Sequence, residues 1–230
     1  MKESPRMSRL IALILALLLV PAWAEDANLS TTTTGSPGAV SRLVLAQRLY
    51  LEALASGDTI TLLAAIRLAR SVKLRQPVAW SRTTEGEVPA DQPLGREAPP
   101  DPGGFQAIYI AQDLAQDVPD LQDLVYALDA QLPQGRLETA TTALAALGGG
   151  QTDTWRISLF GEAQAELGLI GDGDSPLGLT LTDEAGGVIC TTPPSLKPAL
   201  CRFTPARNGF FSVIISNPGA VQNSYLLVGN

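Results

Sequence analysis

Gly209-Phe-Phe-Ser-Val-Ile-Ile-Ser-Asn217 has the pattern of a β-strand, because it starts at a turn-forming Asn208-Gly209 pair and places Val213 and Ile215 on one face. Outward from this stretch, the same two-residue period recurs in Thr154–Phe160, Ala163–Leu169, Leu177–Leu181 and Tyr225–Leu227. Turns rich in Gly and Asp separate several of these runs. Short strands at roughly ten-residue spacing are typical of a β-sandwich, so we predict one over residues 136–230.

The chain has two cysteines, Cys190 and Cys201, and both lie inside this predicted sandwich. Two cysteines in an exported chain usually pair. A metal or redox pair is disfavoured, since the spacing is not C-x-x-C and the chain has no histidine. We therefore predict a structural disulfide between Cys190 and Cys201, closing a proline-rich loop.

Residues 1–24 have the pattern of a signal peptide. A basic start is followed by the apolar run Leu10–Val20 and by the small-x-small site Ala22-Trp-Ala24. The apolar run is shorter than the roughly 20 residues that a spanning helix needs, so cleavage is favoured over anchoring. We predict a periplasmic or secreted protein with no membrane span after cleavage.

The formal net charge of −7 argues against two classes of partner. Nucleic acids and anionic membrane surfaces both attract clustered Lys and Arg side chains. We therefore expect neither nucleic acid nor an anionic membrane surface as a partner, and we expect an envelope protein or a glycan instead.

Residues 38–135 are predicted to be a helical region that follows a polar leader at residues 25–37. Apolar residues recur at helical spacing over four segments, which are 40–55, 59–75, 106–114 and 120–128. Asp58 is a plausible N-cap, and the first two helices would form an αα-hairpin. The Pro- and Gly-rich residues 76–104 are expected to be a long surface loop. The predicted fold class is therefore α+β, with helices before the sandwich.

The absence of histidine removes the Ser-His-Asp, Cys-His and HExxH mechanisms. Paired carboxylates are a histidine-free route to hydrolysis, and Asp172 and Asp174 are the candidates. The same two residues are the candidate ligands for calcium, although an EF-hand loop starting at Asp172 fails at several positions. A solvated turn rich in Asp and Gly is the simpler interpretation.

Four aromatic residues of the predicted sandwich could form a binding platform. Trp155 and Tyr225 occupy apolar-face positions and are expected in the core. Phe210 and Phe211 are adjacent, so only one of them can point inward. The other becomes the best candidate for an exposed binding residue.

Several motifs together resemble the bacterial pre-peptidase C-terminal domain family over about residues 137–230. The segments that carry the resemblance are Gly171-Asp-Gly-Asp-Ser175, Leu177-Gly-Leu-Thr-Leu-Thr-Asp183, Gly186-Gly-Val-Ile-Cys190, Cys201-Arg-Phe-Thr-Pro205, Gly209–Asn217 and Tyr225-Leu-Leu-Val228. The resemblance implies an antiparallel, jelly-roll-like sandwich that is accessory and non-catalytic. It also favours a strand over Thr139–Leu147, where alanines alone would favour a helix. Pro176-Leu-Gly-Leu179 departs from the Asp-Leu-Asp-Leu pattern that the family often carries, which puts an ion-binding role in doubt.

These observations predict an exported, non-catalytic binding or assembly module of the cell envelope. Two alternatives stay open. One is a histidine-free, carboxylate-dependent hydrolase acting on envelope polymers, and the other is a calcium-stabilised structural module.

Overall fold

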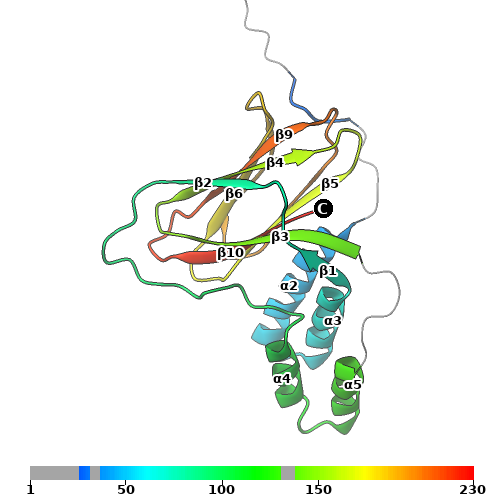
Figure 1. Ribbon diagram of the computed structural model, residues 1–230. Helices are drawn as coiled ribbons and strands as arrows, with labels where there is room; N and C mark the ends of the chain where they lie inside the picture. The colour runs from blue at the N-terminus through cyan, green and yellow to red at the C-terminus, as the bar shows by residue number, and fades with distance from the viewer. Residues whose placement is uncertain (1–25, 32–36, 131–137) are drawn as a thin grey trace, which may run out of the picture.

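Two five-stranded sheets and four helices make up residues 26–31, 37–130 and 138–230, which are the residues that the computed structural model describes. The signal peptide predicted at residues 1–24 lies outside these ranges. Figure 1 shows the sheets stacked as a sandwich with the helices at one end, so the predicted α+β class is confirmed. The elements in chain order are α2 (Ala39–Ser56), α3 (Thr59–Arg70), β1 (Val72–Arg75), β2 (Ser81–Glu85), α4 (Phe105–Leu114), α5 (Pro119–Ala130), β3 (Glu138–Leu147), β4 (Thr152–Leu159), β5 (Ala165–Gly171), β6 (Leu177–Thr182), β7 (Val188–Ser195), β8 (Ala199–Phe203), β9 (Gly209–Ser216) and β10 (Asn223–Gly229).

The strands form sheet A, in the order β1-β3-β10-β5-β8, and sheet B, in the order β2-β4-β9-β6-β7. The pairing of β1 with β3 is parallel, and the other pairings are antiparallel. Alternate residues of the central strands point between the sheets. Phe211, Val213 and Ile215 of β9 are fully buried there, as the period of two predicts. The ambiguous segment at Thr139–Leu147 is a strand.

The prediction from the sequence was wrong for two strands at the edges of the sheets, β1 and β2. The second helix was expected to run to Arg75, but it ends at Arg70, and Val72–Arg75 forms β1. The expected loop over residues 76–104 contains β2, whose five residues are all exposed. A strand with neither face buried needs no apolar alternation, so the period of two does not reveal it.

Residues 190–201 were predicted to be one loop between cysteines, but they include parts of two edge strands. Strand β7 ends sheet B and contains Pro193 and Pro194, which an edge strand tolerates because one side needs no ladder hydrogen bonds. Strand β8 ends sheet A. The bond between Cys190 and Cys201, with an S–S distance of 1.97 Å, therefore joins the two sheets at one side of the sandwich.

Helix α2 lies against the outer face of sheet A, where Val40 and Val44 pack with Ile170 and Val228. Gly168 of β5 allows this close approach, since a Cβ at that position would lie 2.9 Å from Val44 Cγ2. Helix α3 follows as the second arm of a hairpin, and Asp58 caps it by accepting a hydrogen bond from the Ile60 N–H.

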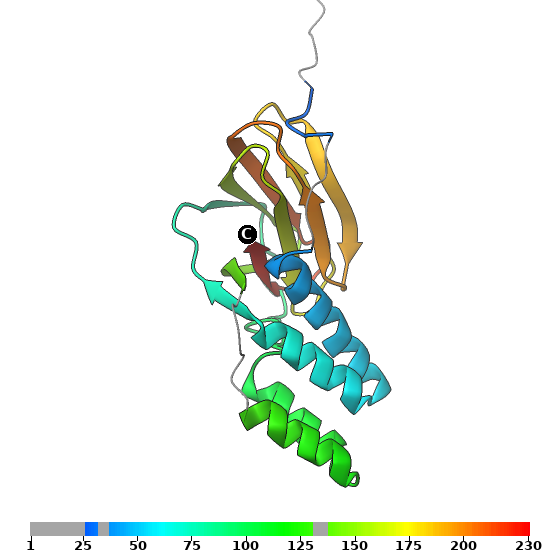
Figure 2. The same ribbon diagram turned by 90° about the vertical axis from the view of Figure 1, so that its right-hand side faces the viewer.

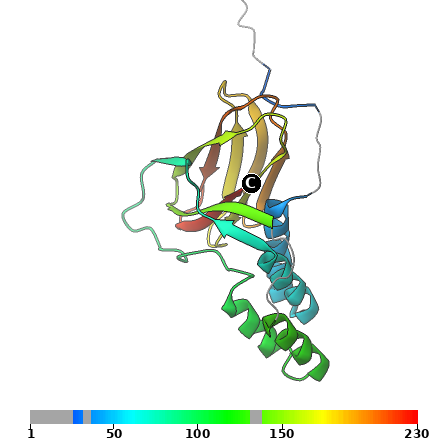
Figure 3. The ribbon, with the colours of Figure 1, turned by 45° about the vertical axis from the view of Figure 1, so that its right-hand side comes forward.

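Helices α4 and α5 extend the helical part away from the sandwich, as the green helices of Figures 2 and 3 show. Small residues of α4, Ala107 and Ala111, are fully buried and belong to one apolar cluster with Ile66 of α3 and Val125 of α5. Helix α5 begins at Pro119, as expected for a proline in a first turn.

Candidate binding site

An open cleft lies at one end of sheet B, where β4 ends and β9 begins. Its volume is about 330 Å³, within the lower part of the range of small-ligand sites. The residues that line it are Ser158, Leu159, Phe160, Glu184, Asn208, Gly209 and Phe210. We call it the Phe160–Phe210 cleft.

Strand alternation puts the aromatic residues of this cleft in solvent. Phe211 is 0% exposed and points into the sandwich, whereas its neighbour Phe210 is 45% exposed. The register pairs Phe210 with Ser158, so Phe160 lies just beyond the paired ends of the two strands and is 77% exposed. Two large apolar side chains are thus held in water at the mouth of one cavity, which marks a contact surface.

Arg156 adds a positive charge beside this surface. Its guanidinium carbon lies 3.9 Å from the centroid of the Phe210 ring, within the range of a cation–π interaction. This contact covers one face of the Phe210 ring and restricts its rotation. Phe210 is also fixed from the backbone, because its N–H donates a 2.6 Å hydrogen bond to Glu184 Oε1.

The turn that carries Glu184 is anchored by the neighbouring carboxylate of Asp183. This carboxylate accepts hydrogen bonds from the N–H groups of Asn28 at 2.7 Å, Gly187 at 2.7 Å and Ala185 at 3.0 Å. Burial alone would raise the pKa of Asp183, but these hydrogen bonds outweigh it and hold the pKa below its ordinary value. The wall of the cleft is therefore held by a carboxylate that stays ionised.

Asp172 and Asp174, the predicted calcium ligands, lie elsewhere and already have partners. Asp172 is buried and accepts hydrogen bonds from the Ser224 N–H at 2.6 Å and the Asp174 N–H at 2.8 Å. Asp174 pairs with Arg96 at 3.5 Å and accepts a 2.7 Å hydrogen bond from the Arg96 N–H. Burial, and the nearby charge of Asp174, raise the pKa of Asp172 despite these hydrogen bonds. Over the ranges given above, no group of three or more His, Cys, Asp or Glu side chains is arranged to hold a metal ion.

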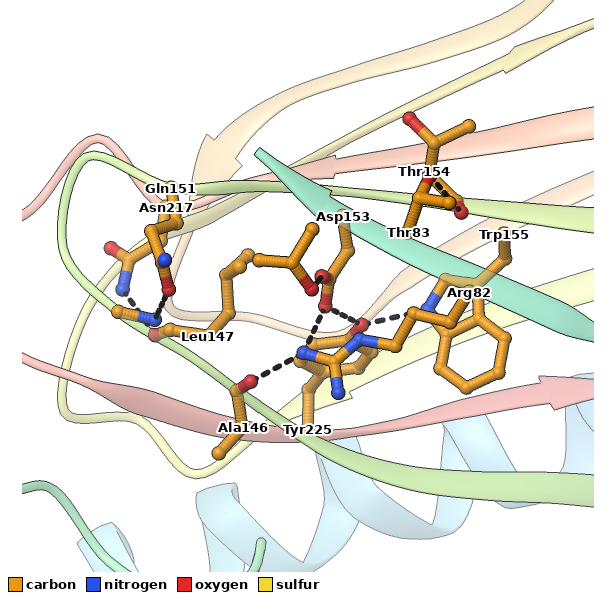
Figure 4. A network of polar contacts seen from close by, with 12 residues as sticks. Arg82, Thr83, Ala146, Leu147, Gln151, Asp153, Thr154, Trp155, Asn217 and Tyr225 are labelled. Carbon is orange, nitrogen blue, oxygen red and sulfur yellow. Dashed lines mark hydrogen bonds and ion pairs between the residues drawn. The ribbon is translucent and has the colours of Figure 1, made fainter. Parts of the chain in front are cut away.

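A second polar cluster, shown in Figure 4, is buried inside the sandwich and was not predicted. Asp153 is fully buried and pairs with Arg82 of β2 at 2.7 Å. The Tyr225 hydroxyl donates to the same carboxylate and accepts a 2.7 Å hydrogen bond from Trp155 Nε1. Burial and the Asp153 carboxylate raise the pKa of Tyr225. This cluster fastens the exposed strand β2 to sheet B, and Trp155 and Tyr225 occupy the core as the sequence predicted.

A larger cavity, of about 450 Å³, lies between α2 and the turn after β7. It is lined by Arg48, Leu51, Glu52, Leu196, Lys197 and Pro198, a set without aromatic residues. Arg48 Nη2 donates a 2.9 Å hydrogen bond to the Pro198 carbonyl and so ties the two walls together. The Phe160–Phe210 cleft is the better candidate because it combines exposed rings with polar side chains.

Within the residues described, none of the helices has both the length and the apolar character to cross a membrane. No protein-family model and no curated protein matches the chain.

Part of the chain is similar to several solved structures, including the following two. The pre-peptidase C-terminal domain of a collagenase from Bacillus anthracis is 14% identical, with a TM-score of 0.33, over 39% of this chain and 88% of that one. The mitogen of Yersinia pseudotuberculosis is 16% identical, with a TM-score of 0.29, over 40% of this chain and 84% of that one. At these TM-scores neither structure assigns the chain to a family. The β-sandwich of the C-terminal part is established by its own two sheets.

Proposed function

We propose that this protein is an exported, non-catalytic binding module of the cell envelope, and that its sandwich holds a glycan in the Phe160–Phe210 cleft. The observation that carries the proposal is the pair of exposed phenylalanine rings at a cavity whose walls are fixed by hydrogen bonds. Membership of the pre-peptidase C-terminal domain family and a periplasmic or secreted location are part of the proposal. They rest on the motifs and on the signal-peptide pattern of the sequence.

A glycan suits the mixed chemistry of this cleft. The C–H faces of a sugar ring are apolar and pack against aromatic rings, while its hydroxyls need hydrogen-bonding partners. Phe160 offers an exposed ring, and Ser158 and Glu184 offer polar groups on the same walls. Because Arg156 already restricts Phe210, less side-chain entropy is lost when a ligand packs there.

The experiment is a binding titration of the mature chain, residues 25–230, with soluble peptidoglycan fragments and with neutral and acidic polysaccharides. Phe160→Ala and Phe210→Ala are each expected to weaken binding by about tenfold or more, as for aromatic residues at the centre of an interface. Phe105→Ala is the control, since it removes a ring as exposed as that of Phe160 from a distant helix. Equal affinity in all three variants, or no binding of any glycan, would overturn the proposal.

A further inference from the structure

The α4–α5 hairpin lies at the end of the molecule farthest from the sandwich (Figure 2). Three of its large side chains are exposed to solvent. Phe105 is 76% exposed, Tyr109 is 60% exposed and Tyr126 is 61% exposed. Phe105 and Tyr109 are four residues apart in α4 and therefore lie on the same side of that helix. The hairpin core needs none of these rings, because small residues such as Ala107 and Ala111 fill it.

A groove between the two helices continues this aromatic surface. A cavity of about 190 Å³ is lined by Gln112 of α4, by Gln116 just after the end of α4, and by Gln122, Val125 and Tyr126 of α5. Gln112 is three residues beyond Tyr109, so the groove and the aromatic stripe adjoin on one side of α4. The Gln122 side chain donates to the Gln116 carbonyl and braces the groove. We call this surface, from Phe105 to Tyr126, the hairpin face.

The charged residues of the hairpin segment itself are all acidic. From residue 97 to residue 130 the sequence has no lysine or arginine, and its acidic residues are Glu97, Asp101, Asp113, Asp117, Asp120, Asp123 and Asp129. Asp129 pairs with Arg70 of α3. Asp113, Asp117, Asp120 and Asp123 are exposed, and none forms a salt bridge with another residue in the described ranges.

We infer that the hairpin face docks a basic segment of a protein partner. Arginine and lysine side chains match both features of this surface, because their charged heads meet the aspartates while their stems and guanidinium planes pack on aromatic rings. A surface of one sign also speeds the encounter with a partner of opposite charge. A second copy of this chain is the less suitable occupant, since each copy carries a net charge of −7.

This site is separate from the Phe160–Phe210 cleft and does not depend on the glycan proposal. If both hold, the sandwich binds the envelope while the helical end binds a protein, and the chain bridges the two.

The test uses the mature chain and two soluble probe peptides of equal length, one alternating Arg and Leu and the other alternating Glu and Leu. We expect the basic probe alone to bind, with an affinity that falls as salt rises. Phe105→Ala with Tyr109→Ala is expected to weaken binding by about tenfold. Asp120→Asn with Asp123→Asn is expected to weaken it and to flatten the salt dependence. Leu94→Ala, which removes a side chain that is 83% exposed outside both the hairpin face and the cleft, is the control and is expected to bind like the unmodified chain.

Three results would overturn the inference. The first is no binding of the basic probe, or equal binding of both probes. The second is a loss in the aspartate variant without any loss in the aromatic variant, which would indicate non-specific attraction of polycations. The third is self-association in sedimentation that Phe105→Ala with Tyr109→Ala abolishes, which would make a second copy the occupant. Circular dichroism of each variant checks that these surface substitutions leave the fold intact.

Discussion

Glu166 of β5 accepts two hydrogen bonds from Ser41 of α2, one from its N–H at 3.0 Å and one from its hydroxyl at 2.7 Å. The Gly38 N–H donates to the same carboxylate at 3.0 Å, and Arg202 of β8 pairs with it at 3.1 Å. Gly38, the N-cap of α2, has no side chain to cap the helix. A carboxylate from sheet A therefore caps the first helix and complements its dipole, which fastens the helical part to the sandwich.

Glu166→Gln is expected to lower the free energy of unfolding at pH 7 by about 2 kcal/mol, the range for hydrogen bonds to a charged group. The amide keeps the shape of the side chain but loses the charge and one acceptor oxygen. Urea titration followed by circular dichroism measures the change. Arg42→Ala, which breaks an exposed pair with Glu138, is the control and is expected to cost about 0.5 kcal/mol.

The stability difference between the unmodified chain and Glu166→Gln is expected to depend on pH. Burial would raise the pKa of Glu166, but the hydrogen bonds from Gly38 and Ser41 and the charge of Arg202 lower it below its ordinary value of 4.5. A lowered pKa in the folded state means that the stabilisation is present above pH 4.5 and is lost as the pH falls through the folded-state pKa. The stability difference between the unmodified chain and Glu166→Gln should therefore shrink on acidification. A difference that grows below pH 4.5 would contradict this account.

Removal of Arg82 should leave the Asp153 carboxylate buried without its ion pair. Arg82→Ala is expected to cost about 3 kcal/mol, since an unpaired buried charge is strongly destabilising. A double-mutant cycle with Asp153→Asn separates the pair from the other contacts of Arg82. Hydrogen exchange should show the amides of β2 losing protection first. If Arg82→Ala costs no more than Arg42→Ala, the cluster does not hold β2.

Replacement of both Cys190 and Cys201 by alanine is expected to lower stability by about 3 kcal/mol, from the entropy of closing a loop of this length in the unfolded chain. Denaturant titration of the oxidised protein and of the double variant measures this difference. Treatment of the unmodified protein with a reductant should reproduce the loss, and a reductant should leave the variant unchanged.

Calcium binding by Asp172 and Asp174 stays an untested alternative to a plain Asp- and Gly-rich turn. Both oxygens of Asp172 already accept backbone hydrogen bonds, and Asp174 pairs with Arg96, so an ion would have to replace these contacts. We therefore expect millimolar calcium to leave the melting temperature unchanged and Asp172→Ala to lower it. A calcium-dependent rise in the melting temperature that Asp172→Asn with Asp174→Asn removes would support the calcium site instead.

The hydrolase alternative is tested with the same double variant. Cleavage of envelope polymers by the unmodified chain, lost in the double variant while it is still folded, would support this alternative.

The central strands could be predicted from the sequence because burial of one face places apolar residues at every second position. Val213 and Ile215 lie two residues apart on one face of β9, and that face meets the core. The same alternation predicted that only one of Phe210 and Phe211 would point inward, and the structure shows that Phe211 does. A role of Phe210 in binding stays a proposal.

The contacts that fasten the parts together could not be predicted in this way. The carboxylate of Glu166 bonds to Ser41, and that of Asp153 pairs with Arg82. The partners are far apart in the chain, so no local spacing indicates these contacts. Phe160 was expected only as the end of an alternating run, and its place in the cleft depends on the pairing of β4 with β9. The hairpin face was missed because its aromatic residues fit a helical period whether or not they are buried.

Strands β1 and β2 also set an order for folding during synthesis. Each supplies an edge of one sheet, yet both emerge before α4 and α5, and their partners β3 and β4 come after those helices. Helices α2 and α3 have local contacts and can form early. The two edge strands can pair only after their distant partners have been synthesised. A fragment starting at residue 137 would leave β3 and β4 with open edges that invite pairing with other chains. The helices and the sandwich are therefore expected to fold best as one polypeptide.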